Sequence, residues 1–119
     1  FMGSRKWYDY AFFNTLPEKE KEKMFDLYAV PESYAVSRQL VLDSYSNINF
    51  KKAHTPLLFI GGGNDHIFPA SLTTTIAGKY KDKNSRVDLK IYDGKSHFIA
   101  GEPGWEKVAD DILDWYEKL

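Results

Sequence analysis

One short apolar run constrains the fold of this chain more than any other feature. Leu57-Leu58-Phe59-Ile60 places four large apolar side chains in succession, between Pro56 and three consecutive glycines. A strand with one face in water alternates apolar and polar residues, whereas a continuous short run is typical of a strand buried on both faces in a parallel sheet. The sequence therefore predicts an α/β protein with a parallel strand at residues 56–60.

The residues after this run continue an alternation of helix and strand. Pro69 starts a predicted helix, and residues 86–92 alternate apolar and polar side chains as a second strand does. From Trp105 to the last residue, apolar side chains recur at helical spacing, which is the strongest periodic signal in the sequence. We therefore expect strand, helix, strand and helix in that order, with Trp105 and Trp115 as core residues of the last helix.

The first 54 residues have a different texture. Thr15-Leu16-Pro17-Glu18 has the S/T-x-x-E form of a capping box, which predicts the start of a helical region that runs to Leu42 with a break at Pro31. Residues 44–55 are rich in Ser, Asn and Lys and are predicted to be a connection. The sequence thus predicts a helical segment at 1–54, followed by a segment of α/β character at 55–119.

Composition excludes several functional classes. The 119 residues carry a net charge of −1 and 43% apolar side chains, which argues against disorder and against nucleic acid or an anionic membrane as a main partner. With no cysteine, this chain holds no disulfide, no thiolate metal site and no Cys nucleophile. Its apolar runs are far shorter than the roughly 20 residues of a membrane span. No secretion signal is visible, so a cytoplasmic location is expected.

Two glycine-rich segments suggest a nucleotide site, but both fail on spacing. Gly61-Gly62-Gly63 lacks the last glycine of G-x-G-x-x-G, because position 66 is His66. Gly94-Lys95-Ser96 ends like a phosphate-binding loop, but the first glycine of that motif would fall at Leu89. No tight metal-binding pair such as H-x-x-x-H occurs either. We therefore expect no cofactor and no metal, and a nucleotide-binding domain is the weaker hypothesis.

Asp65 and His97 are the residues best placed for chemistry. Asp65 follows the first predicted strand and His97 follows the second, and neighbouring parallel strands end at the same edge of their sheet. An Asp bonded to one ring nitrogen of a His fixes the tautomer, which leaves the other nitrogen free to take a proton from a nucleophile or a water. Such a pair supplies two of the three members of a hydrolytic triad.

These motifs together resemble the C-terminal part of an α/β-hydrolase. In that family the acid stands in a G-x-x-D-x-x-x-P context, which Gly62 through Pro69 match, and the catalytic His follows the final strand, as His97 does. The resemblance implies parallel strands with flanking helices, with Asp65 as the orienting acid and His97 as the base. It implies a helical cap or lid at 1–54 and the C-terminal βαβα portion of the core at 55–119.

One element of the family pattern is missing. Its nucleophile precedes the acid and base on a G-x-S-x-G elbow, which does not occur here; Ser96 fails because Phe98 stands where a glycine is required. We therefore expect this chain, which starts at Phe1, to be the C-terminal piece of a longer serine esterase-like hydrolase and to be inactive alone. The resemblance leaves Asp open as the nucleophile, since epoxide hydrolases and haloalkane dehalogenases share the scaffold.

The expected substrate is a small, mostly apolar ester or related acyl compound. Candidate pocket residues are the aromatic side chains near the start and the His beside the acid, namely Trp7, Tyr8, Phe12, Phe13 and His66. The alternatives are packing of the cap on the core for the aromatic residues and a solvent-facing loop for His66. Because an apolar strand exposes an edge, the expected partner is the remainder of the hydrolase chain or a second copy. A non-catalytic interaction module or split partner is the competing hypothesis.

Overall fold

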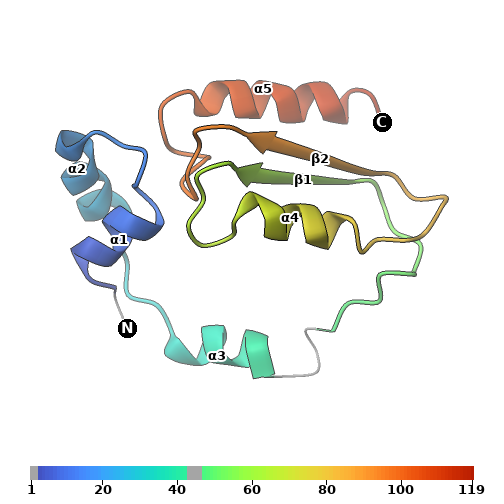
Figure 1. The fold of residues 1–119 in the computed structure, drawn as a ribbon, viewed down its shortest axis with the longest axis horizontal. Helices are drawn as coiled ribbons and strands as arrows, with labels where there is room; N and C mark the ends of the chain where they lie inside the picture. Colours follow the sequence, from blue (N-terminus) through green and yellow to red (C-terminus); the bar gives the residue numbers. More distant parts are fainter. Residues whose placement is uncertain (1–2, 43–46) are drawn as a thin grey trace.

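The computed structural model describes residues 3–42 and 47–119 (Figure 1). In chain order the elements are α1 (Arg5–Ala11), α2 (Glu18–Tyr28), α3 (Tyr34–Leu42), β1 (Leu57–Gly62), α4 (Ala70–Ala77), β2 (Val87–Tyr92) and α5 (Trp105–Tyr116). Both predicted strands, the helix after Pro69 and the last helix are confirmed. Part of the connection predicted at 44–55 falls on residues 43–46, which lie outside the described residues.

The two strands form the parallel pair that the apolar run predicts. They are paired in register from Leu57 opposite Val87 to Gly62 opposite Tyr92. The connecting helix α4 lies on one face of the pair and α5 lies on the other (Figure 1). The result is a mixed α/β structure, consistent with part of an α/β-hydrolase fold, in which both strands end at the same edge of the sheet.

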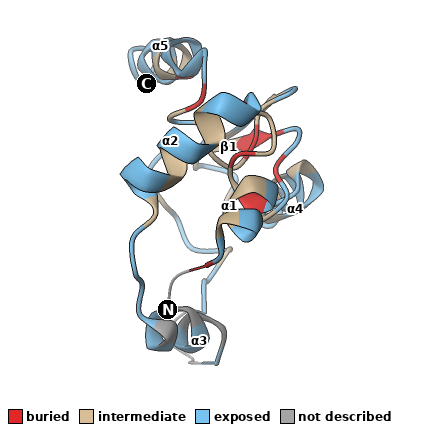
Figure 2. Ribbon diagram, turned by 90° about the vertical axis from the view of Figure 1, so that its left-hand side faces the viewer, coloured by how far each residue is buried: buried red, intermediate tan, exposed pale blue. Residues whose placement is uncertain are grey.

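The apolar face of α5 is only partly covered. Trp105 is 45% exposed and Ile112 on the same stripe is 40% exposed, whereas Val108 is buried. Trp115 is half-buried and donates its indole N–H to Asp88 of β2 at 2.6 Å. The prediction of a core position is therefore wrong for Trp105, because two strands are too narrow to cover the whole helix. Much of α5 accordingly has the colour of exposed residues in Figure 2.

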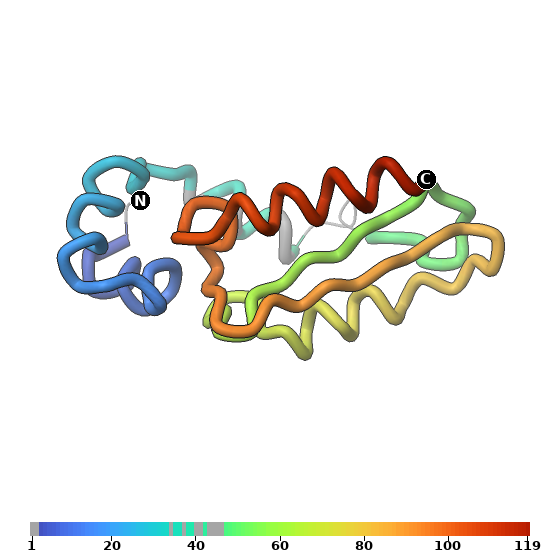
Figure 3. Tube along the Cα trace, turned by 90° about the horizontal axis from the view of Figure 1, so that it is seen from above, coloured from blue at the N-terminus to red at the C-terminus, as the bar shows by residue number. Residues whose placement is uncertain are grey.

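One cluster of buried residues lies at the edge of the sheet where the strands end. Phe13 and Leu16, from the segment between α1 and α2, are buried there, together with Ser96 and Glu102 from the connection between β2 and α5. The rings of Phe13 and Phe98 meet edge to face at 5.2 Å between centroids. Helices α1 and α2 lie beyond the carboxyl ends of the strands (Figures 1 and 3). The N-terminal segment therefore faces the loops that carry the predicted site.

The start of the helical region differs from the prediction. Helix α1 lies in the segment predicted to be helical at 1–54 but before Thr15, where the first helix was expected; Ser4 caps it by accepting the backbone N–H of Trp7 at 3.3 Å. The capping-box prediction is wrong, because Pro17 holds the N-cap position of α2 without a side-chain hydrogen bond. The hydroxyl of Thr15 instead donates to Glu102. The Thr15 hydroxyl thus binds the buried carboxylate of Glu102, whereas the local motif predicted that it would bind a backbone N–H of the helix.

Candidate active site

Asp65 is held by the loop that follows β1. Its Oδ1 accepts the backbone N–H groups of Ile67 at 2.7 Å and Phe68 at 2.8 Å, which is how an Asp stabilises a turn before a helix. The side chain is nearly buried, with 7% of its surface exposed. Because one carboxylate oxygen is used by the turn, the other is free to bind a second partner in a fixed direction.

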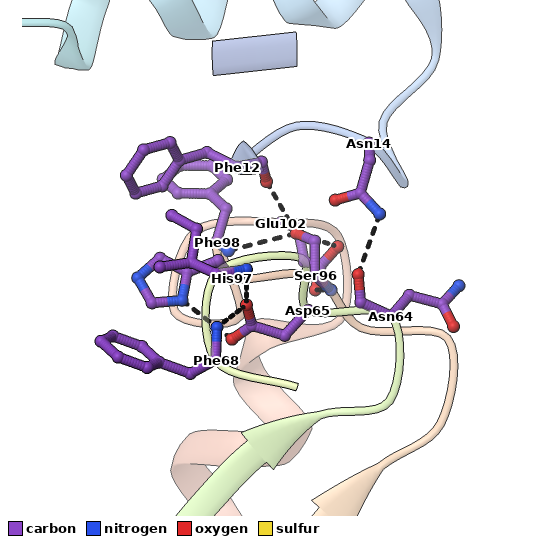
Figure 4. A network of polar contacts seen from close by, with 10 residues as sticks. Phe12, Asn14, Asn64, Asp65, Phe68, Ser96, His97, Phe98 and Glu102 are labelled. Atoms are coloured by element: carbon purple, nitrogen blue, oxygen red, sulfur yellow. Dashed lines mark hydrogen bonds and ion pairs between the residues drawn. The ribbon is translucent and has the colours of Figure 1, made fainter. Parts of the chain in front are cut away.

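That partner is His97. The distance from His97 Nδ1 to Asp65 Oδ2 is 2.8 Å, although the residues are 32 positions apart (Figure 4). An ionised carboxylate can only accept, so the hydrogen of this bond is on Nδ1. In the neutral imidazole, Nε2 then carries the lone pair that can accept a proton. The structure therefore brings the two predicted catalytic residues together in the geometry of an acid–base pair.

Two aromatic rings fix the plane of the imidazole. Phe12 meets His97 edge to face at 5.1 Å between centroids, and Phe68 meets it at 5.4 Å with the rings tilted. Phe12 belongs to the N-terminal segment and Phe68 to the acid loop. The imidazole is thus bounded by groups from two separate parts of the chain, which limits its rotation.

A cavity of about 310 Å³ opens beside the acid–base pair. Asp65 and His97 are on its wall. Most of the remaining wall is apolar and comes from β1, the acid loop, α4 and the histidine loop: Phe59, Ile60, Gly61, Gly62, Phe68, Leu72, Thr73, Ile76 and Ile99. A predominantly apolar cavity with a few convergent polar groups is typical of a small-molecule site.

None of the five predicted pocket residues is on the wall of this cavity. Phe12 contacts the ring of His97, and Tyr8 stacks on Phe12 at 5.3 Å. Phe13 is 1% exposed and is a core residue, while Trp7 is 47% exposed. The exposed His66 stacks on Tyr10, and its Nδ1 is 2.8 Å from the Tyr10 carbonyl oxygen. Their assignment to a substrate pocket stays a prediction.

Sequence reasoning missed a buried polar group beside His97. Glu102 is 3% exposed, and its Oε1 accepts the backbone N–H of Ser96 at 2.8 Å. The hydroxyl of Ser96, a fully buried residue, donates to the carbonyl oxygen of Phe12 at 2.8 Å (Figure 4). Gly101-Glu102-Pro103-Gly104 has the composition of an exposed turn, so no local signal marked Glu102 as buried. Ser96 is committed to this network, which agrees with its rejection as nucleophile.

The N-terminal segment forms hydrogen bonds with both the acid loop and the histidine loop. Asn14 donates its side-chain N–H to the carbonyl oxygen of Asn64 in the acid loop, at 2.9 Å. On the histidine loop, Phe12 accepts from Ser96 and the Thr15 hydroxyl donates to Glu102. The segment at 10–15 therefore acts as a strap across the two loops.

Three groups with shifted pKa values, Asp88, Tyr92 and Asp111, lie between β2 and α5. Hydrogen bonds from Lys107, Lys90 and Tyr92 hold the pKa of Asp111 well below its usual range. Burial, together with the hydrogen bond to Asp111, raises the pKa of Tyr92 to about 12. The pKa of Asp88 is lowered by the hydrogen bond from Trp115 and by the bond from its neighbour Arg86. These shifts belong to the packing of α5 on the sheet.

The described residues form neither a metal centre nor a membrane span. Residues 3–42 and 47–119 contain no group of three or more His, Asp or Glu side chains that could hold a metal ion. Across the same ranges, no helix is both long and apolar enough to cross a membrane.

Comparison with known proteins places the chain in a family. The model of the dienelactone hydrolase family matches residues 35–114, a span that covers more than half of the chain and contains both Asp65 and His97. No curated protein and no solved structure matched the sequence. The chain therefore belongs to the dienelactone hydrolase family, within the α/β-hydrolase superfamily.

Proposed function

We propose that this chain contributes the acid and the base of a catalytic triad that hydrolyses esters or related acyl bonds. The observation that carries the proposal is the 2.8 Å contact between His97 Nδ1 and Asp65 Oδ2, with the acid held by two backbone N–H groups. Membership of a hydrolase family supports the same reaction class. In this role His97 is the general base and acid, and Asp65 orients its ring and stabilises the imidazolium.

The proposed reaction has two stages. His97 Nε2 takes the proton from a nucleophilic hydroxyl while the hydroxyl oxygen attacks the carbonyl carbon of the substrate. The π electrons of the carbonyl move onto the substrate's carbonyl oxygen, which gives a tetrahedral intermediate. The tetrahedral intermediate collapses, the bond to the leaving alkoxide breaks, and His97 gives that alkoxide its proton. In the second stage His97 takes a proton from a water molecule as the water attacks the acyl-enzyme. The bond to the nucleophile breaks, His97 returns the proton to the nucleophile's oxygen, and the carboxylic acid product is released.

The nucleophile in this proposal comes from outside this chain. No serine of the chain stands in a G-x-S-x-G elbow. Ser96 is fully buried, and its hydroxyl donates to the Phe12 carbonyl oxygen. A serine on a segment of the same protein that precedes the acid and the base is the favoured nucleophile, and the 119-residue chain is then inactive alone.

The proposed substrate is small and mostly apolar around its acyl carbon. The cavity beside His97 has a volume of about 310 Å³ and a wall formed largely by Phe, Ile and Leu side chains. The family name refers to a lactone, which is a cyclic ester. An apolar wall favours short alkyl or cyclic acyl groups over charged ones.

The test compares two preparations: the 119-residue chain, and the protein encoded by the complete reading frame that contains it. Turnover of p-nitrophenyl acetate and butyrate is measured, together with labelling by a serine-directed fluorophosphonate. We expect activity and labelling in the complete protein but not in the isolated chain. We also expect Asp65→Asn and His97→Ala in the complete protein to abolish most turnover, whereas Glu106→Gln on the exposed side of α5 should not.

Two outcomes would overturn parts of the proposal. Turnover near the wild-type level in His97→Ala would show that the acid–base pair is residual, as expected of a non-catalytic relative. Turnover that depends on His97 without labelling by the fluorophosphonate would show that the nucleophile is not a serine.

A further inference from the structure

Glu102 is a buried carboxylate whose hydrogen-bond partners, within residues 3–42 and 47–119, are all neutral. It is 3% exposed and accepts hydrogen bonds from the Ser96 backbone N–H and the Thr15 hydroxyl, and its Oε2 is 3.3 Å from Ser96 Oγ. Burying a carboxylate is unfavourable unless hydrogen bonds replace its water. These donors come from two segments that are far apart in sequence, so the burial of Glu102 depends on holding both segments in place.

One of those segments carries His97. Glu102 fixes the N–H of the residue before His97, at 2.8 Å. The residue after it is fixed as well, because the Phe98 N–H donates to Ser96 Oγ at 3.1 Å. The backbone on both sides of the imidazole is therefore held by one connected network.

The other segment carries Phe12, whose ring contacts the imidazole of His97. Thr15 is three residues after Phe12, whose ring meets the imidazole at 5.1 Å and whose carbonyl oxygen accepts from Ser96. Phe13, between them, packs edge to face on Phe98 of the histidine loop at 5.2 Å. Glu102 thus connects the strap to the histidine loop through Thr15 and Ser96, and Figure 4 shows it next to Ser96.

From this arrangement we propose that Glu102 is a positioning residue for His97. It sets the position of the histidine loop and of Phe12, and through them the approach of Nδ1 to Asp65. It does not touch substrate in this proposal. The inference rests on the proposed function only in taking the positioned His97 to be the catalytic base. The contact between His97 and Asp65 can itself be measured without turnover.

The test is NMR spectroscopy of the complete protein, with the His97 imidazole signals assigned by comparison with His97→Gln. In the wild type we expect a far-downfield signal from the hydrogen-bonded Nδ1 proton of His97. Glu102→Ala should lose or broaden that signal. Glu102→Gln should retain it, because a side-chain carbonyl still accepts from the Ser96 N–H. The control is Glu106→Gln, an exposed position in the first turn of α5.

A second variant keeps the proposal testable if Glu102→Ala fails to fold. Thr15→Val removes one donor to Glu102 and preserves the shape of the side chain. It should shift the carbon-bound ring protons of His97, because the ring current of Phe12 changes when the strap moves. An unchanged Nδ1 signal in folded Glu102→Ala, or unchanged His97 ring signals in Thr15→Val, would overturn the proposal.

Kinetics separate this inference from the proposed function. If Glu102 positions a catalytic base, Glu102→Ala lowers kcat at least tenfold with little change in KM, and Glu102→Gln restores most of it. If instead the Nδ1 signal disappears in Glu102→Ala while turnover is insensitive to His97→Ala, the positioning role holds and the proposed function fails.

Discussion

The backbone at Gly62 lies against the carbonyl oxygen of Lys95. A Cβ at position 62 would stand 2.4 Å from that oxygen and 2.6 Å from the carbonyl oxygen of Ser96. Gly62 is the last residue of β1, and Lys95 and Ser96 lead into His97. The end of the acid-bearing strand and the histidine loop therefore pack backbone against backbone, and only glycine allows that approach.

Gly62→Ala should destabilise the protein by roughly 1–3 kcal/mol, because the added methyl group overlaps backbone atoms that cannot move independently. Gly78→Ala is the matched control. The φ of Gly78 is −68°, and a Cβ there would be 3.3 Å from the nearest atom, the carbonyl oxygen of Thr74. Denaturant unfolding of both variants provides the measurement. Equal midpoints for the two would contradict this account of the contact.

Asp65 has two separable roles, one for each carboxylate oxygen. Asp65→Asn retains an oxygen for the N–H groups of Ile67 and Phe68 and should change the free energy of unfolding by less than about 1 kcal/mol. It should still lower kcat of the complete protein by roughly four orders of magnitude, as the wrong tautomer does in other triads. Asp65→Ala should lose about 1–3 kcal/mol of stability as well. Equal stability of the two variants would argue against the turn-stabilising role.

Acid should weaken the packing of α5 on the sheet. The pKa of Asp111 is lower in the folded state than the unfolded value of about 3.9, so its contribution to stability is present above that pH and is lost as the pH falls through the folded pKa. Asp111→Asn should be less stable than the wild type at neutral pH and should lose less stability below about pH 4. Thermal unfolding from neutral to acid pH measures both. If the stability of the variant and of the wild type fell in parallel with pH, this role of Asp111 would be contradicted.

Alkali should act through Tyr92 in the opposite direction. Its folded pKa of about 12 exceeds the unfolded value of about 10, so its contribution is present below pH 10 and is lost as the pH rises through the folded pKa. Tyr92→Phe removes the 2.9 Å hydrogen bond to Asp111, at a cost of about 0.5–1.5 kcal/mol at neutral pH. The variant should show a shallower decline between about pH 10 and 12. A decline as steep as that of the wild type would assign the effect to other groups.

The uncovered face of α5 should bind an apolar dye or a second copy when the 119-residue chain is prepared alone. Trp105, Ile112 and Leu113 are each at least 40% exposed, and an apolar patch in water favours association. Leu113→Lys should reduce both dye fluorescence and the apparent size in gel filtration. A monodisperse monomer that melts cooperatively and binds no dye would contradict the expectation.

The sequence alone was enough to predict the edge that holds the candidate site. A four-residue apolar run and an alternating run predict two parallel strands, and parallel neighbours end at the same edge. Asp65 and His97 were therefore expected to be able to reach each other, and His97 Nδ1 lies 2.8 Å from Asp65 Oδ2. This argument succeeds because it uses only local patterns and the geometry of a sheet. The proposed cap at 1–54 and the identity of the nucleophile are not fixed by such patterns.

What surrounds His97 was decided by the tertiary structure. Thr15 and Glu102 are 87 positions apart, and each has a local reading that is wrong: a helix cap for the first and an exposed turn for the second. Periodicity also predicted the apolar stripe of α5 correctly but not that Trp105 would stay exposed. The physical reason is the same in both cases. Local patterns set which backbone conformation forms, whereas burial of a side chain depends on which distant segments reach it.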